Sequence, residues 1–273
     1  PDIIRFGKDS IFTLKAATSE EDRLQCWNLV YREYLALGYT ARQDLEYRYS
    51  IHDLLPDTAT FLVSAGGAPA GTVTVFPDTP MKLPADEIFH EELDALRHAG
   101  RKPVEIGRLT IGKAYMNDRA LLTNLFDILS LYSRCIRHAT DLVITVNPTH
   151  VKFYEKMLLF ETIGSQKDLG SVRGAPAVLL RLDLELQRQM IRWVHGEGSE
   201  PAGITASRTF YGYFSDHDEE SRRVAWLRRS LKPMSESFLC EYFVQRRRLI
   251  HQLPSFLRYF IEKCYPDYGQ LRC

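Results

Sequence analysis

The sequence predicts a mixed α/β fold over residues 1–185, followed by a helical C-terminal extension over residues 186–273. Two observations predict this arrangement. In the first part, short apolar and β-branched segments alternate with longer amphipathic segments, as strands alternate with helices. In the second part, aromatic residues recur at helical spacing and no segment favours a strand. The stretch at 195–203, rich in glycine and proline, is typical of a linker.

Turn and cap residues place the expected elements. Ser19, with Asp22 three residues later, is a capping-box pattern that opens the first helix, and Gly66-Gly67 between two apolar runs predicts a hairpin. In order, the sequence predicts a strand at 10–18, a helix at 19–39, two strands within 59–76, a helix within 78–100, a strand at 104–111, a helix at 117–139, a strand at 141–146, a helix at 150–160 and a strand at 174–184. Because a helix connects the buried strands 104–111 and 141–146, we expect these two to be parallel neighbours. In the extension we expect two helices over 236–264, broken near Pro254.

Composition narrows the function classes. The 273 residues carry 35 basic and 35 acidic side chains, so we expect no bulk attraction to nucleic acid. The five cysteines form no CxxC pair, which suits a reducing compartment such as the cytoplasm, and no histidine has metal-ligand spacing. We therefore expect no metal. No apolar run reaches membrane-spanning length, which leaves only peripheral contact with a membrane open.

The strand 104–111, read VEIGRLTI, carries charges where a buried strand is expected to be apolar. Glu105 and Arg108 are three residues apart, so in a regular strand they point to opposite faces. A one-residue bulge at Gly107 would place both on the same face. The alternatives are a structural Glu105–Arg108 ion pair, or one charge at a strand end that meets solvent.

Several segments, taken in their order and spacing, resemble the GNAT acyltransferase fold. They are LVYREYLALGY (29–39), LLPDTATFLV (54–63), GTVTVF (71–76), LPADEIF and ELDALRHAGR within 83–101, VEIGRL (104–109), VNPTHVKFYEKMLLF (146–160) and GAPAVLL (174–180). The likeness is closest to long-chain N-acyl amino acid synthases, which are related to acyl-homoserine-lactone (autoinducer) synthases. It covers roughly residues 10–185. It implies a GNAT-like mixed sheet whose bulged fourth strand splays from the fifth and admits the acyl thioester.

The resemblance also implies catalytic roles. Glu105 and Arg108 match the E-x-x-R element that supplies the proposed base of the lactone synthases, and we expect Arg108 to hold Glu105 ionised or to bind a substrate carboxylate. The bulge at Gly107 would free a backbone N–H for the developing oxyanion. Tyr154 matches a tyrosine that often lies near the thioester sulfur; packing against one helix face is its alternative role.

Substrate-binding candidates flank these residues. Arg32, with Tyr31 and Tyr34, lies on the helix that the resemblance places over the acceptor site, although a lone arginine is commonly a solvated one. Asn147 is a candidate for the pantetheine arm, and an ordinary turn before Pro148 is its alternative. His150 beside it favours a helix start. The stretch ARQDLEYRYSIHD, which contains Asp44 and Asp53, departs from the lactone synthases and suits an acceptor that bears a carboxylate.

These features predict an N-acyltransferase that moves a long-chain acyl group from a thioester carrier to the amine of an amino acid. No permanently bound cofactor is expected; acyl-carrier protein or acyl-CoA is the co-substrate. The alternatives are an acetyl-CoA-dependent small-molecule N-acetyltransferase, an enzyme like the acyl-homoserine-lactone synthases, and a GNAT-shaped binding module without catalysis.

The choice of carrier depends on segment 112–124. Coenzyme A users of this fold have a Q/R-x-x-G-x-G/A loop here, but with Arg119 at its first position the glycine positions fall on Leu122 and Asn124. We therefore expect acyl carrier protein as the partner. Lys113, Arg119, Lys152 and Lys156 are expected to form a basic rim for it, with 246–248 as an addition; each alone is commonly a solvated surface cation.

Overall fold

The computed structural model describes residues 3–201, 209–246 and 248–266. One eight-stranded mixed sheet forms its centre, with the strand order β1-β2-β3-β4-β5-β6-β8-β7. The strands are β1 (Ile4–Phe6), β2 (Phe12–Ala16), β3 (Ala59–Ala65), β4 (Ala68–Pro77), β5 (Pro103–Ile111), β6 (Asp141–Val146), β7 (Glu161–Leu169) and β8 (Ala175–Asp183). β5 and β6 are parallel, as the connecting helix predicts, and the other neighbouring pairs are antiparallel.

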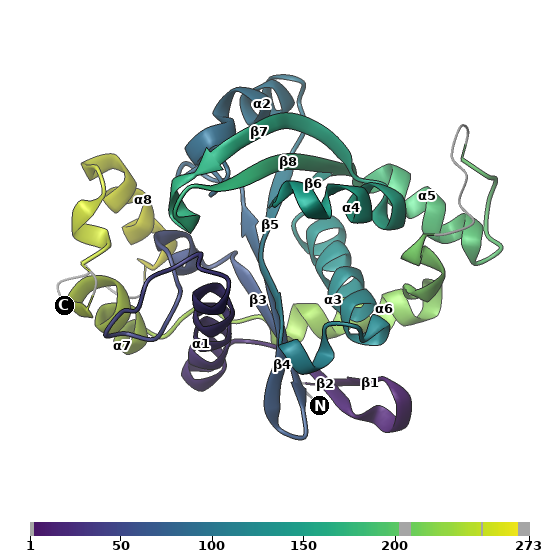
Figure 1. The fold of residues 1–273 in the computed structure, drawn as a ribbon, viewed down its shortest axis with the longest axis horizontal. Helices are drawn as coiled ribbons and strands as arrows, with labels where there is room; N and C mark the ends of the chain where they lie inside the picture. Colours follow the sequence, from purple (N-terminus) through teal and green to yellow (C-terminus); the bar gives the residue numbers. More distant parts are fainter. Residues whose placement is uncertain (1–2, 202–208, 247, 267–273) are drawn as a thin grey trace.

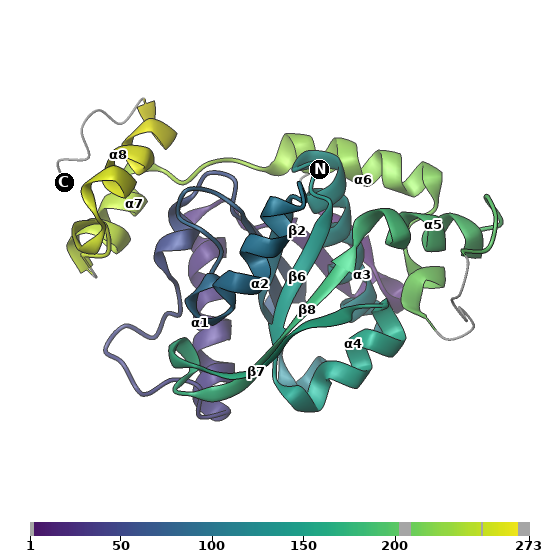
Figure 2. The same cartoon turned by 90° about the horizontal axis from the view of Figure 1, so that it is seen from above.

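Helices cover both faces of this sheet (Figures 1 and 2). They are α1 (Glu20–Ala36), α2 (Asp86–His98), α3 (Arg119–Leu131), α4 (Val151–Leu158), α5 (Leu184–Val194), α6 (His217–Ser230), α7 (Glu236–Leu239) and α8 (Ser255–Cys264). In Figure 2, α1 and α2 lie on one side of the sheet, and α3 to α6 lie on the other. The mixed α/β class predicted from the sequence is confirmed.

The sequence analysis did not predict the two edge strands, β1 and β7. β1 has three residues, and β7 is mostly polar and exposed, so neither shows the apolar pattern of a buried strand. Each pairs with a single neighbour at the edge of the sheet, where solvent can hydrogen-bond to the backbone groups of the free edge. The helix predicted at 117–139 is also shorter, because α3 passes into a π-helical turn at Tyr132–Ile136.

The largest apolar cluster lies between the sheet and α3, α4, α5 and α6. It extends into the C-terminal part of the chain, since Tyr211, Trp226 and Leu227 are buried within it. A second cluster joins α1 to α7 and α8 through stacking of Trp27 on Phe238, with ring centroids 5.5 Å apart. α8 begins directly after Pro254, where the sequence predicts a break.

Candidate active site

The neighbouring strands β5 and β6 separate partway along their length. Their parallel pairing ends where Ile106 lies opposite Ile144. β5 then continues to Ile111 and β6 to Val146 without pairing to each other. The splayed strand pair that the family resemblance implies is therefore confirmed. Backbone groups between separating strands are free to meet an extended substrate.

A β-bulge lies on β5 just beyond this point. Gly107 lies opposite Thr74 and Thr110 lies opposite Thr72, so β5 holds an extra residue between them. Arg108 has a φ of 54°, in the left-handed region. The bulge is thus centred one residue later than predicted, at Arg108 and not at Gly107. The left-handed conformation disfavours a residue with a Cβ, and the contacts of the Arg108 side chain offset that cost.

The bulge brings Glu105 and Arg108 to one face of the sheet. Glu105 contacts Ala85 at the start of α2, and Arg108 contacts Asp53 in the loop after α1. Ile106 points the other way, into the cluster under α3. The prediction drawn from strand parity is therefore correct in its result.

Gly107 has a steric role beside the bulge. A Cβ added to it would lie 2.7 Å from Cε2 of Phe76 on β4. The missing side chain makes room for the Phe76 ring, and the Arg108 guanidinium lies over that ring at 5.1 Å from its centroid. Gly107 has a partner in register on β4, whereas Arg108 and Leu109 have none. The backbone N–H that was expected to be free at Gly107 is therefore to be sought at Arg108 and Leu109.

Glu105 is a buried carboxyl, with 3% of its surface exposed. Its Oε2 accepts a hydrogen bond from the Ala85 N–H at 2.7 Å. Burial raises the pKa of Glu105 to about 8, and the nearby Asp86 carboxylate adds to the rise; the Ala85 N–H and Arg108 oppose it. At pH 7 the protonated form predominates, so a modest change of environment is enough to transfer a proton to or from this group.

Arg108 has a different acidic partner from the one expected. Its Nη1 lies 2.6 Å from Oδ1 of Asp53, and its Nη2 donates to Ser50 Oγ at 2.8 Å. Burial opposes ionisation of Asp53, but the Arg108 charge prevails and keeps the pKa of Asp53 below its ordinary value. The expectation that Arg108 holds Glu105 ionised is therefore wrong. It fails because Asp53, which sequence spacing does not bring near, takes the guanidinium.

Two tyrosines complete the site from opposite sides of the sheet. Tyr154 on α4 is 9% exposed and packs edge to face on Phe160, with ring centroids 5.7 Å apart. Burial raises its pKa, and the Tyr34 phenol raises it further. Burial also raises the pKa of Tyr34; Arg108 and Arg48 oppose that rise. Both phenols are neutral proton donors at pH 7, and no hydrogen bond found among the described residues uses the Tyr154 hydroxyl.

The other substrate-binding candidates do not gather around Glu105. Tyr31 is buried, and its hydroxyl accepts a hydrogen bond from the Gln43 N–H at 3.1 Å, so it anchors the loop after α1. Arg32, its neighbour on α1, is exposed. Asn147 caps the short 3₁₀ turn that follows β6 by accepting from the Thr149 N–H at 3.1 Å, which is the turn role weighed for it.

The basic residues expected to form a rim are dispersed over three elements. Lys113, Lys152 and Lys156 are exposed. Arg119 donates to the Tyr213 hydroxyl at 3.0 Å and lies over the Tyr213 ring. Arg246 forms an ion pair with Glu241 beside α7, on the other side of the molecule, and Arg247 lies outside the described residues.

The sequence analysis did not identify the groups that contact Glu105 and Arg108. The Ala85 N–H, the Ser50 hydroxyl and the Phe76 ring come from three segments far from β5 in sequence. A local signal existed for one of them: Ser50 and Asp53 form a capping box around a 3₁₀ turn. That pattern predicts a fixed turn, but it gives no indication that Arg108 binds it.

In the described part of the chain, no group of three or more His, Cys, Asp or Glu side chains could hold a metal ion. Cys26, Cys135 and Cys264 are free thiols. Cys240 is disulfide-bonded, although the cysteine spacing in the sequence suits a reducing compartment. Over the same described residues, no helix is both long enough and apolar enough to cross a membrane.

Comparison with known proteins places this geometry in context. The family model for the N-acyl amino acid synthase FeeM matches residues 25–183. The chain is similar to the solved structure of FeeM, an N-acyl amino acid synthase from uncultured soil microbes, with 27% identity, a TM-score of 0.57, and coverage of 65% of this chain and 94% of FeeM. It is also similar to a putative N-acetyltransferase from Lactobacillus plantarum, with 16% identity, a TM-score of 0.46, and coverage of 63% of this chain and 98% of the other. A third similar structure is the AHL synthase LasI, with 17% identity, a TM-score of 0.48, and coverage of 63% of this chain and 90% of LasI. No protein of curated function matches the sequence.

The splayed mixed sheet, the family match over residues 25–183 and the likeness to FeeM define the class: the chain is an N-acyltransferase with a GNAT-like fold. Since the family model spans more than half of its length, the chain belongs to the N-acyl amino acid synthase FeeM family.

Proposed function

We propose that this enzyme transfers a long-chain acyl group from a thioester carrier to the amino group of an amino acid. The observation that carries this proposal is Glu105, a buried carboxyl with a pKa of about 8, on the strand whose parallel neighbour leaves it one residue later. A thioester entering between β5 and β6 would place its carbonyl beside this carboxyl. A base with a pKa near the operating pH is the most effective one for proton transfer.

The reaction needs a proton to leave the amine and another to reach the thiolate. Glu105, as the carboxylate, accepts the proton that the amine nitrogen loses as it bonds to the carbonyl carbon. The oxygen of that carbonyl gains charge and is stabilised by the bulge amides of Arg108 and Leu109, which lack partners on β4. The C–S bond then breaks, and the Tyr154 hydroxyl donates a proton to the leaving sulfur. The raised pKa of Tyr154 keeps that proton available at neutral pH.

The acceptor would bind on the α1 side of the site. Arg48 and Arg108 are the cations whose charges reach the Tyr34 phenol, and Arg48 lies 5.4 Å from the centre of the Tyr34 ring. Arg108 already binds Asp53 and Ser50. Arg48 also donates to the Ser171 carbonyl. We assign the carboxylate of the amino acid to the side of the site where Arg48 lies over Tyr34, with Arg32, on the same helix as Tyr34, as an outer contact.

The donor would be acyl carrier protein. The N-terminus of α3, where coenzyme A users bind the pyrophosphate, is occupied by the chain itself: Asp118 accepts from the Leu121 N–H at 3.0 Å. This carboxylate satisfies a helix-terminal donor and repels a diphosphate. A carrier protein presents a single phosphate on the pantetheine arm, and the exposed Lys113, Lys152 and Lys156 suit its acidic surface.

A long acyl chain suits the apolar flanks of the opening. Leu109 and Ile111 on β5 and Tyr154 on α4 belong to or pack against the main apolar cluster. Each buried CH₂ contributes about 0.8 kcal/mol, so chain length would dominate the selection of donor.

Mass spectrometry of lipid extracts tests this function. Cells that overproduce the chain should accumulate N-acyl amino acids, and cells that produce Glu105→Gln to the same level should not. An extract without new N-acyl species would reject the proposal, and acetylated amines in their place would favour a small-molecule N-acetyltransferase.

A further inference from the structure

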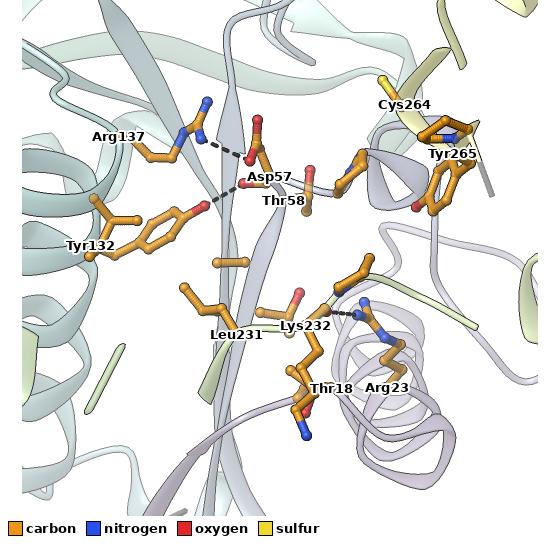
Figure 3. A pocket seen from close by; sticks show the side chains of 17 residues that line it. Thr18, Arg23, Asp57, Thr58, Tyr132, Arg137, Leu231, Lys232, Cys264 and Tyr265 are labelled. Atoms are coloured by element: carbon orange, nitrogen blue, oxygen red, sulfur yellow. Dashed lines mark hydrogen bonds and ion pairs between the residues drawn. The ribbon is translucent and has the colours of Figure 1, made fainter. Parts of the chain in front are cut away.

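A second hollow lies away from the splayed strands. Figure 3 shows this pocket, which has a volume of about 350 Å³ and is lined by segments that are distant in sequence. They are the end of β2, the first turn of α1, the start of β3, the π-helical turn after α3, the segment after α6, and the residues that follow α8. A volume of this size is within the range of sites for small organic ligands. None of its lining residues belongs to the proposed active site.

Arg23 is the feature of this pocket that needs an explanation. It is 7% exposed, yet no carboxylate of the described residues lies within ion-pair distance of its guanidinium. Its Nη2 donates to the backbone carbonyl of Lys232 at 3.3 Å, and its buried Nε has no hydrogen-bond partner among the residues that the structure describes. Burial lowers the pKa of Arg23, and the more distant Tyr265 and Asp53 only partly oppose this. A buried charge without a counter-charge is costly, and buried charges are ordinarily paired. An anion bound in the pocket would supply the missing partner.

The other charged residues that line the pocket determine which ligand charge it favours. Arg137 is already neutralised, since its Nη1 lies 2.8 Å from Oδ1 of Asp57. Lys232 is exposed at the rim and adds one positive charge. With Arg137 and Asp57 paired to each other, Arg23 is the one buried cation left in this wall, and Lys232 lies at the exposed rim. A ligand with a single negative charge would therefore balance the buried cation.

The rest of the lining is apolar or small. Tyr132, Ile136, Leu231 and Pro233 face the pocket together with Thr18, whose hydroxyl takes part in no hydrogen bond found among the described residues. We propose that this pocket binds a small organic monocarboxylate, whose carboxylate meets the Nε edge of Arg23 and whose apolar body lies against Ile136 and Leu231. A planar carboxylate matches the guanidinium edge with two parallel hydrogen bonds.

Calorimetric titration of the whole protein with butyrate tests this site without reference to catalysis. Butyrate should bind saturably, whereas its uncharged analogue butyramide should not. Arg23→Met should weaken butyrate binding by at least about tenfold, as expected for loss of a charged hydrogen bond. Arg188→Met is the matched control, because Arg188 is an exposed arginine on α5 outside this pocket, and it should bind as the unaltered chain does.

Stability measurements separate a ligand site from a structural role. If Arg23 serves a ligand, Arg23→Met should keep or raise the melting temperature without butyrate, because an unpaired buried charge is removed. Butyrate should then raise the melting temperature of the unaltered chain and not that of the variant. Thr18→Val and Lys232→Gln, which leave Arg23 in place, should each weaken binding several-fold.

Three results would overturn the proposal. They are the absence of saturable butyrate binding, butyrate binding that Arg23→Met leaves intact, and inorganic phosphate binding as tightly as butyrate. Failure of Arg23→Met to fold, together with unchanged binding in Thr18→Val and Lys232→Gln, would assign Arg23 a structural role instead. Loss of acyl transfer in Glu105→Gln has no bearing on these outcomes.

Discussion

Glu105 and Arg108 are on the same strand and face, yet their surroundings give them opposite electrostatic behaviour. Arg108 is fixed by Asp53 and Ser50, whereas Glu105 accepts one backbone N–H and lies near the Asp86 carboxylate. Burial therefore dominates at Glu105 and raises its pKa, while ion pairing dominates at Asp53 and lowers it. This separation leaves one carboxyl able to move a proton near neutral pH and another held as a counter-ion.

Replacement of Glu105 by Gln should lower kcat/KM by about 10²–10⁴, the usual contribution of a positioned base. In the unaltered enzyme, kcat/KM should rise as the pH increases toward about 8, because the carboxylate form becomes populated through that pKa. This inflection should be absent from Glu105→Gln. Steady-state rates measured over about three pH units around that pKa test this.

The same variant gives a control through its stability. A raised pKa means that ionisation of Glu105 opposes folding, so the stability it contributes is full below its unfolded pKa and is lost as the pH rises through about 8. Glu105→Gln should remove that loss. Urea unfolding with the same pH dependence in both proteins would contradict the assignment of the raised pKa to Glu105.

Replacement of Asp53 by Asn should destabilise the protein by about 3–5 kcal/mol, because it leaves the Arg108 charge buried without a partner. Asp94→Asn is the matched control, since Asp94 pairs with Arg97 and Lys82 at the surface. Its effect should be much smaller. Urea denaturation compares the two, and equal losses would show that the Asp53–Arg108 pair has no special role.

At the scale of elements, the bulge on β5 depends on a close contact with β4. Gly107→Ala would bring a Cβ within 2.7 Å of Phe76 and should destabilise the protein by about 1–3 kcal/mol. Phe76→Leu in the same chain should recover part of that loss, as a double-mutant cycle would show. Gly212→Ala is the control, because a Cβ there meets nothing within 4 Å. Additive effects of Gly107→Ala and Phe76→Leu would contradict the proposed contact.

The elements also show how far sequence reasoning reaches. Strand period and helix caps predict β2 to β6, β8 and α1 to α4, and the parity of Glu105 and Arg108 predicts the bulge within one residue. The edge strands β1 and β7 lack an apolar face, so their period carries no signal. The partner of Arg108 lies 55 residues away in the chain. That pairing is decided by how a loop packs against the sheet, which local patterns do not contain.

At the scale of the molecule, the C-terminal residues contribute to the same cores as the acyltransferase fold. Tyr211 is buried against α4, where its hydroxyl donates to the Leu158 carbonyl, and Phe238 stacks on Trp27 of α1. The division into an acyltransferase domain at 1–185 and an extension at 186–273 stays a prediction. The packing favours a supporting role for the extension.

The preference for a carrier is a property of the whole surface. With one acyl chain on both donors, we expect a higher kcat/KM for acyl carrier protein than for acyl-CoA at low salt. The advantage should shrink as salt shortens the screening length from ~10 Å at 0.1 M to ~3 Å at 1 M. Lys152→Glu with Lys156→Glu should weaken the carrier reaction alone, whereas Lys263→Glu on α8 should change neither. Equal or better kinetics with acyl-CoA at low salt would reject the carrier.

The central claim, that Glu105 serves acyl transfer to an amino acid between β5 and β6, is tested most directly with purified protein. A long-chain acyl thioester and an isotope-labelled amino acid are mixed, and the released thiol and the N-acyl product are quantified together by mass spectrometry. We predict one labelled N-acyl amino acid for each thiol released, and a product rate lowered by about 10²-fold or more in Glu105→Gln. Thiol release without labelled product, or an unchanged product rate in Glu105→Gln, would contradict the claim.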